Sequence, residues 1–269
     1  MTKANYKPHI FALSVLFTLG NAIISPPEFG IINLVLTFII SLVVVCFFGR
    51  LKFCQNIIAL VSAIYGVTTT AIDYIRFLKQ EQMSNTSIVL LVVVFGIMVS
   101  FLGVIKPRAI YKYSLFAFLI VTVILALCLV AGIANFEYKN LAESIKNSNI
   151  SANRILSLFL PLVALSTFTQ AENQPPKPMF FGVIIGIFLL FITMIQSALI
   201  LGGNTSDYPY FKSVSTISVG SLFTRLYGLV WFVFFVTSVI KTVVCVKVIE
   251  SAFKRGKIKP SDIYKPKTL

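Results

Sequence analysis

Charged residues, and acidic residues above all, are scarce in this sequence. Only 12% of its 269 residues are charged and 57% are hydrophobic, whereas soluble domains carry about 25% charged residues. Asp and Glu together number 9. This composition excludes a water-soluble globular protein. The apolar residues form blocks of roughly 20 residues, which is the length needed to cross a bilayer. We therefore expect an all-α integral membrane protein.

Residue types that build catalytic and metal sites are equally rare. His9 is the one histidine, and it lies at the edge of an apolar segment. The 4 cysteines lie in or beside apolar segments without paired spacing, so neither a disulfide framework nor a metal site is predicted. The sequence contains no carboxylate pair, Cys/His cluster or glycine-rich phosphate loop. We expect neither an enzyme nor a cofactor.

Eight apolar segments are candidate membrane spans. They cover residues 9–26, 29–48, 55–78, 87–105, 114–134, 154–171, 179–202 and 220–249. The first ends in Ser-Pro-Pro-Glu, without the small residues of a signal-peptide cleavage site, so we expect it to stay in the mature protein. The pattern predicts one helical transmembrane domain over residues 1–251 and a basic cytoplasmic tail over residues 252–269.

The net charge of +14 is best explained by positively charged cytoplasmic loops. If the N-terminus is cytoplasmic, fifteen of the 23 basic residues fall on the cytoplasmic side and seven outside, with Lys241 inside the last span. This bias favours cytoplasmic N- and C-termini and an even number of spans. The basic tail is expected to lie near anionic lipid headgroups, and no nucleic-acid partner is expected.

Two outside connections are longer than a turn. Residues 135–153 are expected to be either a linker or a short surface helix. Residues 203–219 mix aromatic residues, glycine and proline, and are either a linker or a lid over an outward-facing vestibule.

Two spans carry interruptions at similar depth. Gly20–Asn21 lies about eleven residues into the first span, roughly 17 Å along a helix. Pro161 lies at a similar depth in the sixth span and removes a backbone donor there. Broken helices in membranes are tolerated where protein or a water-filled cavity satisfies the backbone, and transporters use them to bind substrates. The pair therefore favours a binding site over simple packing, and Tyr65 of the third span is a candidate for its wall.

Two further features have a structural and a functional interpretation. Gly182 and Gly186 form a small-xxx-small pattern that is most simply explained by close helix packing. Lys241 is a charge inside the last span, and such charges are costly and usually functional. Its long side chain could instead extend toward the cytoplasmic edge near Lys247, so both roles stay open.

Three stretches together resemble one family of membrane proteins. The opening KPHIFALSVLFTLGNAIISPP, the link TQAENQPPKPMFFGVIIG and the C-terminal YPYFKSVSTISVGSLFTRLYGLVWFVFFVTSVIKTVVCVKV resemble the permease-like B subunit of bacterial spore germinant receptors. That family belongs to the amino acid–polyamine–organocation transporter superfamily. In the last stretch the resemblance rests on the aromatic–Pro–aromatic turn at Tyr208–Tyr210, on LFTRL and on VIKT around Lys241.

The resemblance implies two inverted five-helix repeats that hold substrate between broken first and sixth helices. The residues that it places in the two unwound segments are Gly20, Asn21 and Ala22, with Leu160, Pro161 and Leu162. It places Lys241 where ion-coupled members of the fold hold a cation against the first span, so that its ammonium could substitute for that cation. The family usually has ten spans and acidic residues near the position of Arg225. With eight spans, this chain is expected to be truncated or degenerate, which puts autonomous transport in doubt.

The first functional hypothesis is a nutrient-sensing membrane subunit of a spore germination receptor. It would lie in the bacterial cell or spore inner membrane, bind a small solute such as an amino acid, and act with the receptor's A and C subunits. The alternative is a proton- or sodium-coupled amino acid transporter. A third hypothesis, an inert assembly scaffold, predicts no stabilisation by any ligand.

Overall fold

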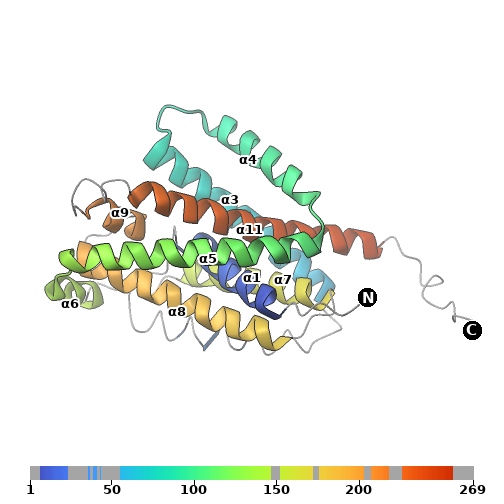
Figure 1. The fold of residues 1–269 in the computed structure, drawn as a ribbon. Coiled ribbons are helices and arrows are strands. Elements are labelled where there is room, and N and C mark those ends of the chain that lie inside the picture. Colours follow the sequence, from blue (N-terminus) through green and yellow to red (C-terminus); the bar gives the residue numbers. More distant parts are fainter. Residues whose placement is uncertain are drawn as a thin grey trace, which may run out of the picture.

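The fold is a bundle of helices lying lengthwise beside one another (Figure 1). The computed structural model describes residues 7–23, 55–146, 152–171, 176–202, 207–217 and 226–256, with four single positions between residues 36 and 43. Within these ranges every regular element is helical and none is a strand. The prediction of an all-α architecture is confirmed for this part of the chain.

Seven of the described α-helices overlap predicted apolar segments, and α6 and α9 lie in the predicted connections. Their bounds are α1 (Lys7–Leu19), α3 (Gln55–Phe77), α4 (Ile88–Gly103), α5 (Pro107–Gly132), α6 (Tyr138–Lys146), α7 (Ala152–Ala171), α8 (Pro176–Leu201), α9 (Pro209–Ser215) and α11 (Leu226–Gly256). Short 3₁₀ turns follow α1 (Gly20–Ala22) and α5 (Ile133–Asn135), and a π-helical turn follows α3 (Leu78–Gln82). The expected span 29–48 falls almost wholly outside the described residues.

Four described segments are long and apolar enough to cross a membrane. They are Ile57–Glu81, Pro107–Asn135, Pro176–Leu201 and Gly228–Phe253. Shorter apolar helices occupy Lys7–Leu19, Ile88–Phe101 and Ile155–Ala171. These lengths and compositions support a membrane-embedded protein, because roughly 20 apolar residues in a helix span the hydrocarbon core.

Helix α1 lies in the centre of the bundle, where nearly every side chain from Ile10 to Leu19 is buried. Two glycines of α8 let that helix approach closely. A Cβ on Gly182 would lie 2.6 Å from the carbonyl oxygen of Phe11, and one on Gly186 would lie 2.7 Å from Cβ of Thr18. The packing interpretation of this glycine pair is therefore confirmed, in keeping with the use of small residues at helix contacts in membranes.

The connection before α7 contains the surface helix α6, which covers the C-terminal end of α8. Asn140 donates from Nδ2 to the carbonyls of Leu199 and Ile200 at 3.2 and 3.3 Å, and Ser144 Oγ donates to the Gly202 carbonyl at 2.8 Å. The last carbonyls of a helix have no partner within it, so these side chains satisfy groups that would otherwise need water. Of the two alternatives left open for residues 135–153, a linker or a short surface helix, the structure shows the helix over Tyr138–Lys146.

The connection after α8 contains α9, which is packed into the bundle and is more than a plain linker. Tyr210, Phe211 and Val214 of this helix are buried. The ring of Phe77, at the end of α3, meets the rings of Tyr208, Phe211 and Phe234 edge-on, each at 5.1 Å between centroids. Burial, followed by the charge of neighbouring Asp207, raises the pKa of Tyr208 to about 12.

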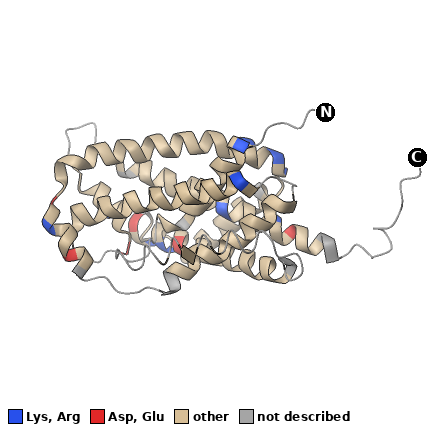
Figure 2. Ribbon diagram, turned by 90° about the horizontal axis from the view of Figure 1, so that it is seen from below, with Lys and Arg blue, Asp and Glu red and all other residues tan. Residues whose placement is uncertain are grey.

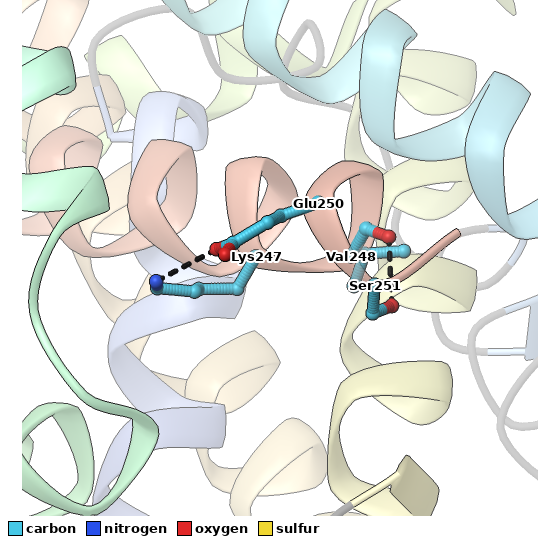
Figure 3. Close-up of polar contacts among 4 residues, drawn as sticks. All are labelled: Lys247, Val248, Glu250 and Ser251. Carbon is cyan, nitrogen blue, oxygen red and sulfur yellow. Dashed lines mark hydrogen bonds and ion pairs between the residues drawn. The ribbon is translucent and has the colours of Figure 1, made fainter. Parts of the chain in front are cut away.

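Charged residues are distributed unevenly between the two ends of the bundle. Basic residues that begin α1, α5 and α8 gather at one end, and most acidic residues of the described chain lie toward the other (Figure 2). The start of α1 and the end of α11 lie toward the same end (Figure 1). Near the end of α11, Lys247 and Glu250 form an ion pair of 2.8 Å, and Ser251 donates to the Val248 carbonyl (Figure 3).

Candidate functional site

The α-helical geometry of the first predicted span ends where the sequence predicts a break. The α-helical part of α1 ends at Leu19, and Gly20 has a φ of +26°, outside the range that other residues readily adopt. The chain then passes into the 3₁₀ turn Gly20–Ala22. The hydroxyl oxygen of Thr237, on α11, lies 2.8 Å from the Val233 carbonyl oxygen of its own helix and 3.2 Å from the Gly20 carbonyl oxygen, so its single proton is shared between the two carbonyls. A polar side chain of α11 thus contacts the backbone of the turn inside the protein.

Lys241 is directed into the bundle and not toward its edge. Its side chain is 1% exposed, and its stem lies over the Gly20 turn. A Cβ on Gly20 would come within 2.6 Å of Lys241 Cδ, so a larger residue would force this stem to shift. The Lys241 ammonium lies 5.9 Å from the centroid of the Phe17 ring, within the range of a cation–π contact. The alternative in which Lys241 extends toward the cytoplasmic edge is therefore wrong.

The sixth predicted span is helical throughout, so the expectation of an unwound segment at Leu160–Pro161–Leu162 is wrong. Helix α7 runs from Ala152 to Ala171 with Pro161 inside it. A proline within a helix removes one hydrogen bond and crowds the carbonyl four residues earlier, but it does not force the remaining turns to open. Pro161 and Leu162 are buried against neighbouring helices, and this packing keeps α7 helical.

The proline nevertheless changes the hydrogen bonding of α7 at one position. Ser157 lies four residues before Pro161. The nitrogen of Pro161 carries no hydrogen and so cannot donate to the Ser157 carbonyl, as another residue at position 161 would within the helix. Lys241 Nζ lies 3.5 Å from that carbonyl oxygen, at the long end of hydrogen-bond distance. The Gly20 turn and the carbonyl one turn before Pro161 thus both lie next to one side chain of α11.

The place where Lys241 lies beside Gly20 of α1 and near the Ser157 carbonyl of α7 is called the junction below. Helix α3 also packs there. A Cβ on Gly66 would lie 3.2 Å from Pro161 Cβ and 2.9 Å from Cys245 Sγ, so α3, α7 and α11 pack closely here. Tyr65, the residue predicted to line the site, is half-buried. It is the following residue, Gly66, that faces Pro161.

The remaining predicted site residues occupy different environments. Ala22 is buried beyond the Gly20 turn, and Leu160 is half-buried on α7. The backbone of Asn21 belongs to the 3₁₀ turn, but its side chain lies outside the described part of the structure. The structure therefore brings together Gly20, Pro161 and Lys241 most directly.

Three residues of the junction were missed from the sequence: Phe17, Ser157 and Thr237. Two of them follow from simple spacing. Thr237 lies four residues before Lys241, on the same face of α11, and Ser157 lies four residues before Pro161. Phe17 carries no such signal, because an aromatic residue in a buried apolar helix is usually a packing residue.

At this junction a lysine ammonium lies near one backbone carbonyl, that of Ser157, and near the aromatic face of Phe17. Among the described residues, no group of three or more His, Cys, Asp and Glu side chains is arranged to hold a metal ion. Comparison with family models, with curated proteins and with solved structures found no match for the chain.

Proposed function

We propose that the protein is a solute-sensing membrane subunit of a spore germination receptor, which binds a small nutrient such as an amino acid beside the interrupted first helix. The resemblance to the germinant-receptor B subunit supports this function. In the proposed arrangement both chain ends are cytoplasmic, and the A and C subunits of the receptor receive the conformational change. The membrane is that of the bacterial cell or of the spore.

The observation that carries the proposal is the position of Lys241 across the Gly20 turn. Its buried stem packs on Gly20, and its ammonium approaches a carbonyl of α7. Ion-coupled transporters of the proposed fold hold a mobile cation against the first helix. A lysine side chain supplies the same charge but cannot leave, which suits a protein that changes conformation on binding without driving uptake.

The proposed fold is transporter-like, with the first helix interrupted at Gly20 and the sixth continuous. An inverted-repeat arrangement is expected from the resemblance. A ligand would then contact the turn Gly20–Ala22 from one side, while α7 supplies an intact wall. Because the turn is joined to α11 through Thr237 and Lys241, movement of the turn is expected to move α11.

Ligand-dependent thermal stabilisation of the purified full-length protein in detergent tests this function. We expect one or a few members of a panel of amino acids and sugars to raise the melting temperature. Lys241→Met is expected to remove that response, whereas Lys247→Met, near the end of the same helix, is expected to keep it. No response to any member of the panel would favour the scaffold hypothesis.

The transporter hypothesis is separated by uptake into proteoliposomes. With an imposed proton or sodium gradient, a sensor is expected to show binding without accumulation of the radiolabelled ligand. Saturable, gradient-driven accumulation would contradict the sensor and favour the transporter.

A further inference from the structure

Helix α6 meets the bundle with a polar side. Asn140 and Ser144 donate from this side to the last carbonyls of α8. Just before the helix, the backbone N–H of Glu137 donates to the Leu199 carbonyl at 3.0 Å. Residues four apart lie on the same face of a helix, so Asn140 and Ser144 form one continuous contact with the end of α8.

The apolar residues of α6 form a separate stripe that faces away from this contact. Tyr138 is 83% exposed, Ile145 is 40% exposed, and Ala142 between them is also exposed. Positions i, i+4 and i+7 share one face of a helix, so we call these three residues the apolar face of α6. A surface helix of a soluble protein turns such a face toward the core. In α6 the face is instead turned away from the helix on which α6 packs.

The position of α6 indicates what this face contacts. Figure 1 shows α6 at the end of the bundle where α5 and α8 both end. Those two helices belong to segments long enough to cross a membrane, Pro107–Asn135 and Pro176–Leu201. The outward surface of α5 is 66% exposed at Val130 and 58% exposed at Ile133, and it leads along the chain to Tyr138. The apolar face of α6 therefore follows directly on a surface that faces lipid.

The charged residues of α6 fit the same position. Lys139 and Glu143 are exposed and lie four residues apart, in a sector between the apolar face and the contact with α8. Their charges cancel, so insertion of apolar side chains, and not attraction to anionic lipid, has to hold the helix. Tyrosine is enriched where membrane meets water, and amphipathic helices lie there with their apolar face buried and their charged side in water.

We propose that α6 is an interfacial anchor, whose apolar face inserts between the lipid headgroups at this end of the bundle while Asn140 and Ser144 hold the end of α8. In the proposed orientation this is the outer leaflet. The anchor joins the membrane surface to the end of a spanning helix through a helix of 9 residues. The inference goes beyond the proposed function, because it holds equally for a sensor, a transporter or a scaffold.

Tryptophan fluorescence of the full-length protein in phosphatidylcholine nanodiscs tests the anchor. Tyr138→Trp is combined with Trp231→Phe, which removes the single native tryptophan. The lipid carries bromine near the headgroup end of its acyl chains. We expect roughly half of the emission to be lost to this lipid, because an interfacial helix buries its apolar face about 5–10 Å into the boundary between headgroups and acyl chains.

Lys139→Trp in the same background is the matched control, because this position lies in the charged sector. Its emission is expected to be quenched by aqueous iodide and not by the brominated lipid. Iodide quenching of Tyr138→Trp as strong as that of Lys139→Trp would overturn the anchor and leave the apolar face to a protein partner. If Trp231→Phe is not recovered folded, the same quenching is measured as the difference between Tyr138→Trp and the wild type.

Hydrogen exchange in the same nanodiscs tests the link to α8. Ile145→Asp places a charge in the apolar face and is expected to withdraw α6 from the lipid. Because Asn140 and Ser144 hold the end of α8, the amides of its C-terminal turn should then exchange several-fold faster. Lys139→Asp puts the same side chain in the charged sector and is expected to leave this exchange unchanged. Unchanged exchange in Ile145→Asp as well would contradict the anchor.

Discussion

Helices α4 and α8 are both almost entirely apolar, yet their environments are opposite. Along α4 most side chains are exposed, including Val89 at 71% and Phe101 at 76%, and a Cβ on Gly96 would meet nothing within 4 Å. In α8 the glycines at 182 and 186 lie in contact with α1. Helix α4 lies at the edge of the bundle (Figure 1). Hydrophobicity alone therefore does not decide which helix is packed.

The difference in packing between α4 and α8 follows from the lipid that surrounds the helices. In a membrane, lipid chains are as apolar as leucine, so burial of apolar surface does not drive one helix onto another. Close packing of small residues and hydrogen bonds between helices decide the contacts instead. The packed helices carry such features, among them the glycine pair of α8 and the polar face of α11 around Thr237 and Lys241.

The largest expected effect comes from filling the glycine contact of α8. Gly182→Ala would place a Cβ 2.6 Å from the backbone oxygen of Phe11, which forces α1 and α8 apart. We expect a loss of about 1–3 kcal/mol in the free energy of unfolding, which is typical of overpacking. Denaturation in mixed micelles measures it, and Gly96→Ala on α4 is the matched control with little or no loss. Equal losses at the two sites would remove the distinction between the helices.

A second substitution extends the comparison to the end of α1. Gly20→Ala combines an unfavourable φ of +26° with a contact of 2.6 Å to Lys241 Cδ. We expect a loss of about 1–2 kcal/mol, because strained backbone costs this much and the flexible lysine stem relieves part of the clash. Gly228→Ala on α11, where a Cβ would meet nothing within 4 Å, is expected to be neutral. Thermal unfolding of both variants tests the difference, and a destabilised Gly228→Ala would contradict it.

The third substitution concerns a hydrogen-bonded end of α8. Asn140→Ala removes the donor to the carbonyls of Leu199 and Ile200, with an expected loss of about 1 kcal/mol. Hydrogen exchange at the C-terminal turn of α8 should rise locally. Lys139→Ala, on the exposed side of α6, serves as the control and is expected to change neither quantity. A response confined to α6 itself would show that this helix does not stabilise α8.

The smallest effect is expected at the ion pair of α11. Lys247 and Glu250 lie 2.8 Å apart, but the carboxylate side chain is 39% exposed, so solvent weakens their attraction (Figure 3). Lys247→Ala is therefore expected to cost less than about 0.5 kcal/mol, and the cost should fall further in high salt. A loss as large as that at Gly182 would show that this pair within one helix stabilises the protein as much as the close contact between α1 and α8.

Much of the fold could be predicted because its determinants are local. Apolar length located the helices, the glycine spacing of α8 identified a packed face, and Gly20 marked the end of α1. The course of α7 through Pro161 was not predicted, because a proline weakens one hydrogen bond while the neighbouring helices decide whether the chain opens. The direction of the Lys241 side chain was left open for a similar reason, since a flexible stem can reach either the edge or the interior.

The sequence by itself determined that this is a helical membrane protein whose first helix loses α-helical geometry at Gly20, since apolar length and backbone restriction act within a few neighbouring residues. Only the tertiary structure decided that the ammonium of Lys241 approaches the Ser157 carbonyl beneath Pro161 and that its stem fills the space beside Gly20. These contacts join α1, α7 and α11, and their geometry depends on how three separate helices cross, which no local pattern contains.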